Sequence, residues 1–194
     1  MVSPAPAPPG LLYVPELITP AEERPLIAWL AAAEAWQEVR FRGQVARRRV
    51  LSFGARYVTQ GRRIEPAPPL PPALCPLRDR MVEAACQRLG PALTLAGRRP
   101  ADFARCTVLH YAPGAGIGWH TDSAIFGPTV LALSLGTAAR LQLRSGDNTG
   151  RGGPAFDLAL APRSLFVLAG EARATWKHRL CSVAHERYSI TVRC

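Results

Sequence analysis

The sequence predicts an α+β protein in which helices from the first half pack on the β-sheets of the second half. Two observations support this fold class. Apolar residues recur at helical spacing in two segments before residue 90, and after residue 100 short β-branched and apolar segments alternate with Gly and Pro. So many short strands in one region indicate a sandwich or jelly roll and not βαβ units.

The first helix is expected to begin at Thr19. Thr19 is a good N-cap residue, Pro20 suits the first helical position, and Glu22 completes a capping box. Residues 11–18, before this helix, have the composition of a short strand. The helix should pack on a sheet through an apolar stripe. Trp29 lies at the margin of this stripe and is also expected in the core. The stripe consists of Leu26, Ile27, Leu30 and Ala33.

A second helix is expected over about residues 73–89, because apolar residues recur on one face before Gly90 and Pro91 end the pattern. A proline-rich connector, residues 65–76, leads into it. The glycine-rich segment 145–154 is expected to form a mobile surface hairpin. The strands of the second half are expected at residues 103–111, 129–135, 140–144, 155–160, 164–168, 175–180 and 187–193.

The length of 194 residues suits one domain with a substantial core. Residues 1–10 are rich in Pro and Ala and are expected to form a flexible tail, so that residues 11–194 make up the domain. No apolar run reaches the ~18 residues of a membrane span, and the tail lacks the features of a signal peptide. Five cysteines without a CxxC pair fit neither a disulfide framework nor a zinc site. We therefore expect a cytoplasmic monomer.

The formal net charge of +10 favours a polyanionic partner, because positive charge raises the encounter rate with nucleic acid. Nearly all of this charge is arginine, since Lys177 is the one lysine. A composition rich in Ala, Pro, Gly and Arg would also be basic, so charge alone leaves the partner open. Within residues 36–63, arginines are interleaved with aromatic residues, which suits phosphates and unstacked bases; the alternative is a solvated hairpin.

His120 and Asp122 lie two positions apart, so in an extended segment both side chains point to one face. Adjacent residues do not cover a triangular face of a metal's coordination sphere, so the third ligand must come from elsewhere in the fold. His178 is the best candidate, in a short segment between turns. Two histidines and one carboxylate form the facial triad that holds non-haem Fe(II).

In the closing segment 187–193, polar and apolar residues alternate, which predicts a half-buried strand. Two arginines on its polar face indicate a bound anion, because guanidinium groups bind carboxylates bidentately and stay charged when buried. The fitting anion is 2-oxoglutarate, with one end on the iron and the far carboxylate on Arg187 or Arg193. The alternative is an edge strand with solvated arginines. The polar face consists of Arg187, Ser189, Thr191 and Arg193.

Residues 109–193 resemble the AlkB family of Fe(II)/2-oxoglutarate dioxygenases. Residues 49–57 are more weakly similar to the substrate lid of that family. The resemblance implies a double-stranded β-helix over about residues 101–194 and a lid over about residues 36–63. It also favours His178 over His185 as the third ligand, because Arg187 then follows at the family's spacing. The matching motifs are Tyr111-Ala112-Pro113-Gly114, the His120–Asp122 pair, Leu133-Ser134-Leu135-Gly136, Gly170-Glu171-Ala172-Arg173, His178 and the closing Arg-x-Ser-x-Thr-x-Arg.

The resemblance further implies the roles of the site residues, with dioxygen as the second cosubstrate and no catalytic residue beyond the iron site. The ligands of Fe(II) are expected to be His120, Asp122 and His178. The residues expected to contact 2-oxoglutarate are Tyr111, Arg187, Ser189, Thr191 and Arg193. The residues expected to contact the substrate are Tyr57, Arg56, Trp119 and Trp176.

For function, the resemblance implies oxidative demethylation of N-alkylated bases in single-stranded DNA or RNA, which is alkylation repair. Two departures bear on the substrate and cosubstrate. Ala124 stands where DNA-repair members carry an acidic residue that helps to recognise the base, and Leu109 and Ser189 replace asparagines near the cosubstrate. The alternatives are hydroxylation or demethylation of a tRNA base, or a protein- or small-molecule-directed oxygenase. A non-enzymatic RNA-binding module is disfavoured by the complete set of ligands and arginines.

Overall fold

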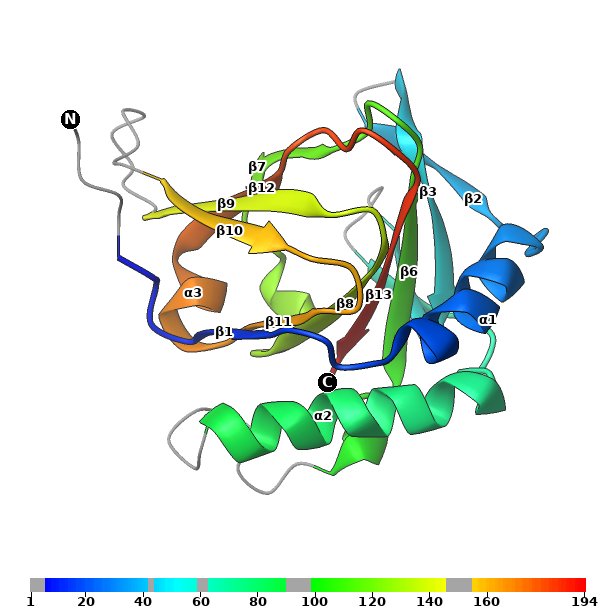
Figure 1. The fold of residues 1–194 in the computed structure, drawn as a ribbon, viewed down its shortest axis with the longest axis horizontal. Coiled ribbons are helices and arrows are strands. Elements are labelled where there is room, and N and C mark those ends of the chain that lie inside the picture. The colour runs from blue at the N-terminus through cyan, green and yellow to red at the C-terminus, as the bar shows by residue number, and fades with distance from the viewer. Residues whose placement is uncertain (1–5, 42–43, 59–62, 90–98, 146–154) are drawn as a thin grey trace.

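The computed structural model describes residues 6–41, 44–58, 63–89, 99–145 and 155–194. Within these ranges, two antiparallel sheets enclose a cavity, and two long helices lie against the larger sheet (Figure 1). The predicted α+β jelly roll is therefore confirmed.

The larger sheet has seven strands in the order β1-β11-β8-β13-β6-β3-β2. Strand β13 lies at its centre, where Ser189 is opposite Ser134 on one side and Leu109 on the other. The alternative of an edge strand for the closing segment is therefore wrong. The strands are β1 (Leu11–Val14), β11 (Leu165–Leu168), β8 (Val130–Gly136), β13 (Arg187–Arg193), β6 (Arg105–Tyr111), β3 (Gln44–Phe53) and β2 (Gln37–Phe41).

The smaller sheet has four strands in the order β10-β9-β12-β7. They are β10 (Phe156–Leu160), β9 (Ala139–Ser145), β12 (Trp176–Leu180) and β7 (Ile117–His120). His178 of β12 lies opposite His120 of β7, so the ladder brings together two histidines that are distant in sequence. A separate two-stranded ribbon consists of β4 (Ala55–Val58) and β5 (Arg63–Pro66), and β5 includes the start of the predicted connector.

Helix α1 (Pro20–Ala31) begins as predicted, because the Thr19 side chain accepts a hydrogen bond from the Glu22 N–H and the Glu22 carboxylate accepts one from the Thr19 N–H. Leu30 of the predicted stripe is fully buried. The prediction that Trp29 lies in the core is wrong, because its side chain is 40% exposed. Adjacent helical residues point in directions about 100° apart, so the residue before Leu30 turns towards solvent.

A short 3-10 turn, η1 (Pro72–Leu74), leads into helix α2 (Cys75–Leu89), close to the predicted boundaries. The remaining helical elements are single turns: η2 (Pro100–Asp102), η3 (Ala124–Phe126) and α3 (Gly170–Ala174). None of the helices in the described ranges is long and apolar enough to cross a membrane. The buried face of α2 carries Leu77, Met81, Val82 and Ala85.

Residues 8–10, which the sequence assigns to the tail, form hydrogen bonds with the domain. The carbonyl oxygens of Pro9 and Gly10 accept hydrogen bonds from the N–H groups of Ala172 and Ala169, and β1 then continues along β11. Residues 1–5 lie outside the described residues. So does nearly all of the predicted hairpin at residues 145–154, of which residue 145 alone is described.

Strand β13 separates two environments. Its odd-numbered residues are polar and line the cavity between the sheets; Arg187, Ser189 and Thr191 are buried, and Arg193 at the end of the strand is half-buried. Its even-numbered residues, Tyr188, Ile190 and Val192, belong to the apolar cluster that also contains Leu30 of α1 and Met81 of α2. The helices therefore stabilise the larger sheet from outside, while the polar face of β13 is left for the cavity.

Glu23 connects α1 to the end of β8. The side chain is 8% exposed; its carboxylate accepts a hydrogen bond from the Gly136 N–H at 2.9 Å and pairs with Arg163 at 3.1 Å. Gly136 has a φ of +84°, in the left-handed region that favours glycine. The carboxylate thus fixes the helix at the turn that follows the strand.

Replacement Glu23→Ala is expected to lower the free energy of unfolding by about 1–3 kcal/mol, because it leaves the buried Gly136 N–H without an acceptor. Urea denaturation followed by far-UV circular dichroism measures this change. As a control, Glu34→Ala removes an exposed carboxylate soon after the same helix and should change the free energy by no more than about 0.5 kcal/mol. Equal effects of the two replacements would contradict the role assigned to Glu23.

Candidate active site

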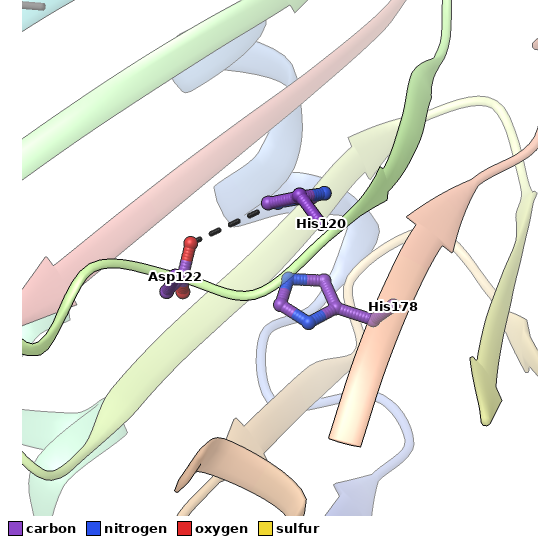
Figure 2. Close-up of side chains that lie close together, drawn as sticks. All are labelled: His120, Asp122 and His178. Atoms are coloured by element: carbon purple, nitrogen blue, oxygen red, sulfur yellow. Dashed lines mark ion pairs between the residues drawn. The ribbon is translucent and has the colours of Figure 1, made fainter. Parts of the chain in front are cut away.

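Three side chains with metal-binding atoms converge at the end of β7. Figure 2 shows His120 and Asp122 on this segment with His178 of the neighbouring β12 beside them. Their ligand atoms all lie within 4.8 Å of one another, and they form the one such group among the described residues. The structure therefore brings together the three predicted metal ligands and leaves His185 out.

The protonation states of these groups suit a divalent metal. The carbonyl oxygen of Gly118 lies 2.8 Å from His120 Nδ1, so a neutral ring carries its proton there and leaves Nε2 free, 3.8 Å from Asp122 Oδ1. Burial, and then the nearby His120, lowers the pKa of His178 to about 4, so this ring is neutral at pH 7. Its buried Nδ1 has no hydrogen-bond partner among the described residues.

The Asp122 carboxyl is ionised although it is partly buried. Burial alone would raise its pKa, but the nearby charges, first of all Arg193, lower the pKa overall. Neutral imidazoles and an ionised carboxylate are the forms in which these residues bind metals. The residues present therefore fit the Fe(II) site predicted from the sequence.

Arg173 holds the backbone that carries Asp122. Its side chain is 5% exposed, and it donates hydrogen bonds to the carbonyl oxygens of Asp122 at 2.9 Å and Ser123 at 2.7 Å. Arg173 belongs to α3, directly before β12 and His178. One short segment thus carries one metal ligand and positions another. The sequence analysis noted the motif around Arg173 but assigned the residue no role.

Two arginines of β13 line the cavity, Arg187 fully buried and Arg193 half-buried. Arg187 is 1% exposed; its Nη2 donates to Ser134 Oγ at 2.9 Å, and its guanidinium lies 5.1 Å from the centroid of the Tyr111 ring. Arg193 donates from Nη1 to Thr107 Oγ1 at 3.2 Å. Burial lowers the pKa of each guanidinium, and the Nε atom of each is buried with no partner in the described part of the chain.

Neither arginine forms an ion pair with a carboxylate of the described residues. A buried cation without an anionic partner is unfavourable, so the arrangement fits a bound anion. Arg193 is near Asp122, whose pKa it lowers, and therefore belongs to the metal end of the site. Arg187, opposite Tyr111 and Gly136, belongs to the far end. Arg187 is thus the better candidate for the far carboxylate of 2-oxoglutarate, a choice that the sequence left open.

The metal ligands and the two arginines of β13 line one cavity of about 790 Å³. All the predicted metal and cosubstrate residues line it, including Ser189 and Thr191, which are each 4% exposed. Burial raises the pKa of the Tyr111 hydroxyl, which therefore stays protonated as a hydrogen-bond donor. The structure places every predicted cosubstrate residue around the same space as the metal ligands.

The predicted substrate residues divide into two groups. Tyr57, Arg56 and Trp119 line the cavity, and Arg56 pairs with Glu65 across the β4–β5 ribbon at 2.8 Å. Trp176 does not line the cavity; its ring packs against another cluster of buried apolar residues, separate from the one beneath the helices. Trp176 shares a strand face with His178, but it lies at the beginning of β12.

Phe126 is a cavity residue that the sequence analysis missed. Its ring meets Tyr57 edge-on, with 5.1 Å between the centroids, and the Arg193 guanidinium lies 4.8 Å from the Phe126 centroid. The η3 turn that carries Phe126 is held by Arg105, which donates to the carbonyl oxygens of Ile125 and Cys194. The one indication in the sequence that Phe126 lines the cavity was its position in the loop after Asp122.

Comparison with known proteins identifies the family and supports the fold. The family model described as the 2OG-Fe(II) oxygenase superfamily matches residues 10–193. Among solved structures, "The structure of OsALKBH1" has a TM-score of 0.73 at 15% identity and covers 97% of this chain and 98% of that one. An oxidoreductase of the 2OG-Fe(II) oxygenase family from Burkholderia pseudomallei has a TM-score of 0.63 at 18% identity, with coverages of 95% and 84%.

Two curated relatives have names that mention nucleic acid. The "tRNA (carboxymethyluridine(34)-5-O)-methyltransferase ALKBH8" of Mus musculus is 29% identical over 172 residues, which are 88% of this chain and 24% of the relative. The "Alkylated DNA repair protein ALKBH8 homolog" of Arabidopsis thaliana is 28% identical over 187 residues, covering 88% and 50%. The chain spans about a quarter of the length of the mouse protein and half of the plant protein.

The chain belongs to the 2OG-Fe(II) oxygenase superfamily. Its motifs and its similarity to ALKBH8 proteins support the AlkB family within that superfamily. The chain is therefore an oxidoreductase whose cofactor is Fe(II) and whose cosubstrates are 2-oxoglutarate and dioxygen.

Replacement Arg173→Ala is expected to weaken Co(II) binding on the order of 10-fold, because Asp122 loses the contacts that hold its backbone. Titration of the visible absorption of bound Co(II) measures the affinity. Arg88→Ala, at an exposed position of α2, serves as the control and should leave the affinity unchanged. Unchanged Co(II) affinity in Arg173→Ala would show that these carbonyl contacts do not position the ligand.

Replacement Arg187→Met is expected to weaken 2-oxoglutarate binding about 100-fold, which corresponds to about 3 kcal/mol. It should also raise the stability of the ligand-free protein by about 1–4 kcal/mol, because an unpaired buried charge is replaced by an apolar side chain. Thermal melting with and without 2-oxoglutarate, in the presence of Mn(II), tests both effects. Arg187→Lys keeps the charge without the guanidinium fork and should give an intermediate affinity. A full ligand-induced rise in Tm for Arg187→Met would rule out Arg187 as the carboxylate site.

Proposed function

We propose that the protein oxidatively demethylates an N-alkylated base in nucleic acid, the activity of alkylation repair. The observation that carries this proposal is the combination of side chains that line one cavity. The metal ligands, Arg187 and Arg193 line it. So do the rings of Tyr57 and Phe126, together with Arg56. Aromatic rings stack on flat bases, and guanidinium groups suit the neighbouring phosphates.

The residues act by binding and orientation. His120, Asp122 and His178 would hold Fe(II), which with 2-oxoglutarate and dioxygen supplies the oxidising chemistry that breaks a substrate C–H bond. Arg187 and Arg193 would hold the carboxylates of 2-oxoglutarate. Oxidation of an N-methyl group releases its carbon as formaldehyde and restores the base.

The substrate base must enter the cavity from outside the stack. Tyr57 and Phe126 would hold its faces so that the alkyl group points to the ligand set, while the buried walls of both sheets exclude water. A base paired within a duplex cannot reach a site enclosed between two sheets. The substrate is therefore single-stranded nucleic acid or a base flipped out of its helix.

A second candidate function is hydroxylation of a tRNA base to a stable product. Ala124 favours it, because an exposed alanine at the start of η3 replaces the acidic side chain with which DNA-repair members recognise alkylated bases. The tRNA-related name of the mouse relative supports tRNA as the first polymer to test. The DNA-related name of the plant relative supports testing DNA beside it.

Mass spectrometry of N-methylated single-stranded DNA and tRNA, incubated with protein, Fe(II), ascorbate and 2-oxoglutarate, tests the proposal. Demethylation should remove one CH2 unit from the base and depend on 2-oxoglutarate. Addition of one oxygen atom to the base would establish the second candidate instead. The variant Asp122→Ala should abolish either change, whereas Glu34→Ala, which removes an exposed carboxylate, should retain it. Succinate formed without any change in either polymer would overturn both candidates.

A further inference from the structure

The outer face of the smaller sheet carries a cluster of positive charge. Side chains alternate between the two faces of a strand, and His178 of β12 points to the metal site. Lys177 and Arg179, on either side of it, therefore point outward, and Arg144 of β9 lies directly opposite Lys177. These three cations and Trp119 of β7, which contacts two of them, are named the basic cluster.

Trp119 organises the cluster. The guanidinium carbons of Arg144 and Arg179 lie 4.3 Å and 5.0 Å from its ring centroid. A second contact fixes Arg179, because its Nε donates a hydrogen bond to the side chain of Gln142. The amide of Gln142 in turn donates a hydrogen bond to Asp157. The two guanidinium groups are therefore held in place by neighbours on three strands. Freely solvated arginines would instead turn away from each other.

Among the described residues, no acidic side chain pairs with these cations. Asp157 is the one carboxylate among the described strand residues of this face, and it pairs with Arg140 at 3.7 Å. Among the residues that the structure describes, no carboxylate forms an ion pair with Arg144, Lys177 or Arg179. Like charges held together on one ring repel each other, so the cluster suits an anionic partner.

The basic cluster adjoins the active site, because Trp119 lines the cavity and directly precedes the metal ligand His120. We propose that the cluster binds phosphate groups of the single-stranded nucleic acid whose modified base enters the cavity, an inference that rests on the proposed function above. The guanidinium forks of Arg144 and Arg179 bind phosphate oxygens in pairs, and Lys177 contributes a point charge. The strand would thus be held on the rim while one base is inside.

Fluorescence anisotropy of a short labelled single strand, as RNA and as DNA of one sequence, over a series of salt concentrations tests this inference. For the wild type, log affinity should fall linearly with log salt concentration. The double variant Arg144→Gln/Arg179→Gln should make the slope shallower by about 1.4, because each lost phosphate contact contributes about 0.7. Lys177→Gln should make it shallower by about 0.7 and is the substitute if melting shows that the double variant does not fold.

The matched control is Arg24→Gln/Arg88→Gln, which removes the same charge from exposed positions on α1 and α2, against the other sheet (Figure 1). Its slope should equal that of the wild type. A flat wild-type response would overturn the proposed function together with this inference. A steep wild-type slope that is unchanged in the basic-cluster variants, or reduced equally in the control, would overturn the inference alone.

Discussion

The burial of Arg187 and Arg193 on the central strand of the larger sheet is the constraint on which the interior depends. Strand β13 is paired along its whole length with β6 and β8. A shift of one residue in either register would turn the arginines into the apolar cluster beneath the helices, so the register is strongly specified. The apolar residues on the opposite face of β13 supply the favourable burial that offsets two desolvated charges. Ligand binding and folding are therefore coupled, since a dicarboxylate that binds only the folded chain also stabilises it.

The active site exists only where the two sheets meet. The larger sheet supplies the arginines, and the smaller sheet supplies the paired histidines through the β7–β12 ladder. Asp122 lies beyond the end of β7, outside either ladder, and its backbone is held by Arg173 from the turn before β12. Rigid strands thus position two ligands, and hydrogen bonds to carbonyl oxygens position the third. Because no single element contains the site, its geometry depends on the packing of the whole domain.

Local patterns predicted those parts of the molecule that depend on local rules. The capping box at Thr19, the alternation in β13 and the spacing of His120 and Asp122 follow from nearest neighbours in the chain, and the structure contains all three. The role of Arg173 was not predictable, because its partners are carbonyl oxygens that every residue has. Phe126 lies in a turn without periodicity, and the exposure of Trp29 depends on a small rotation at the margin of a stripe. These contacts are decided by tertiary packing.

The distribution of charge gives information that the net charge of +10 lacks. On the helical side, Arg80 pairs with Glu22 and Arg78 with Asp79. On the smaller sheet, the cations beside Trp119 have no carboxylate partners among the described residues, and two arginines inside the cavity share this property. The described residues thus leave cations without carboxylate partners both in the basic cluster on the outer face and in the cavity. A phosphate would pair with the cations outside, and a carboxylate would pair with those inside. Strand β12 connects the two groups, because its alternating residues face the metal site and the basic cluster in turn.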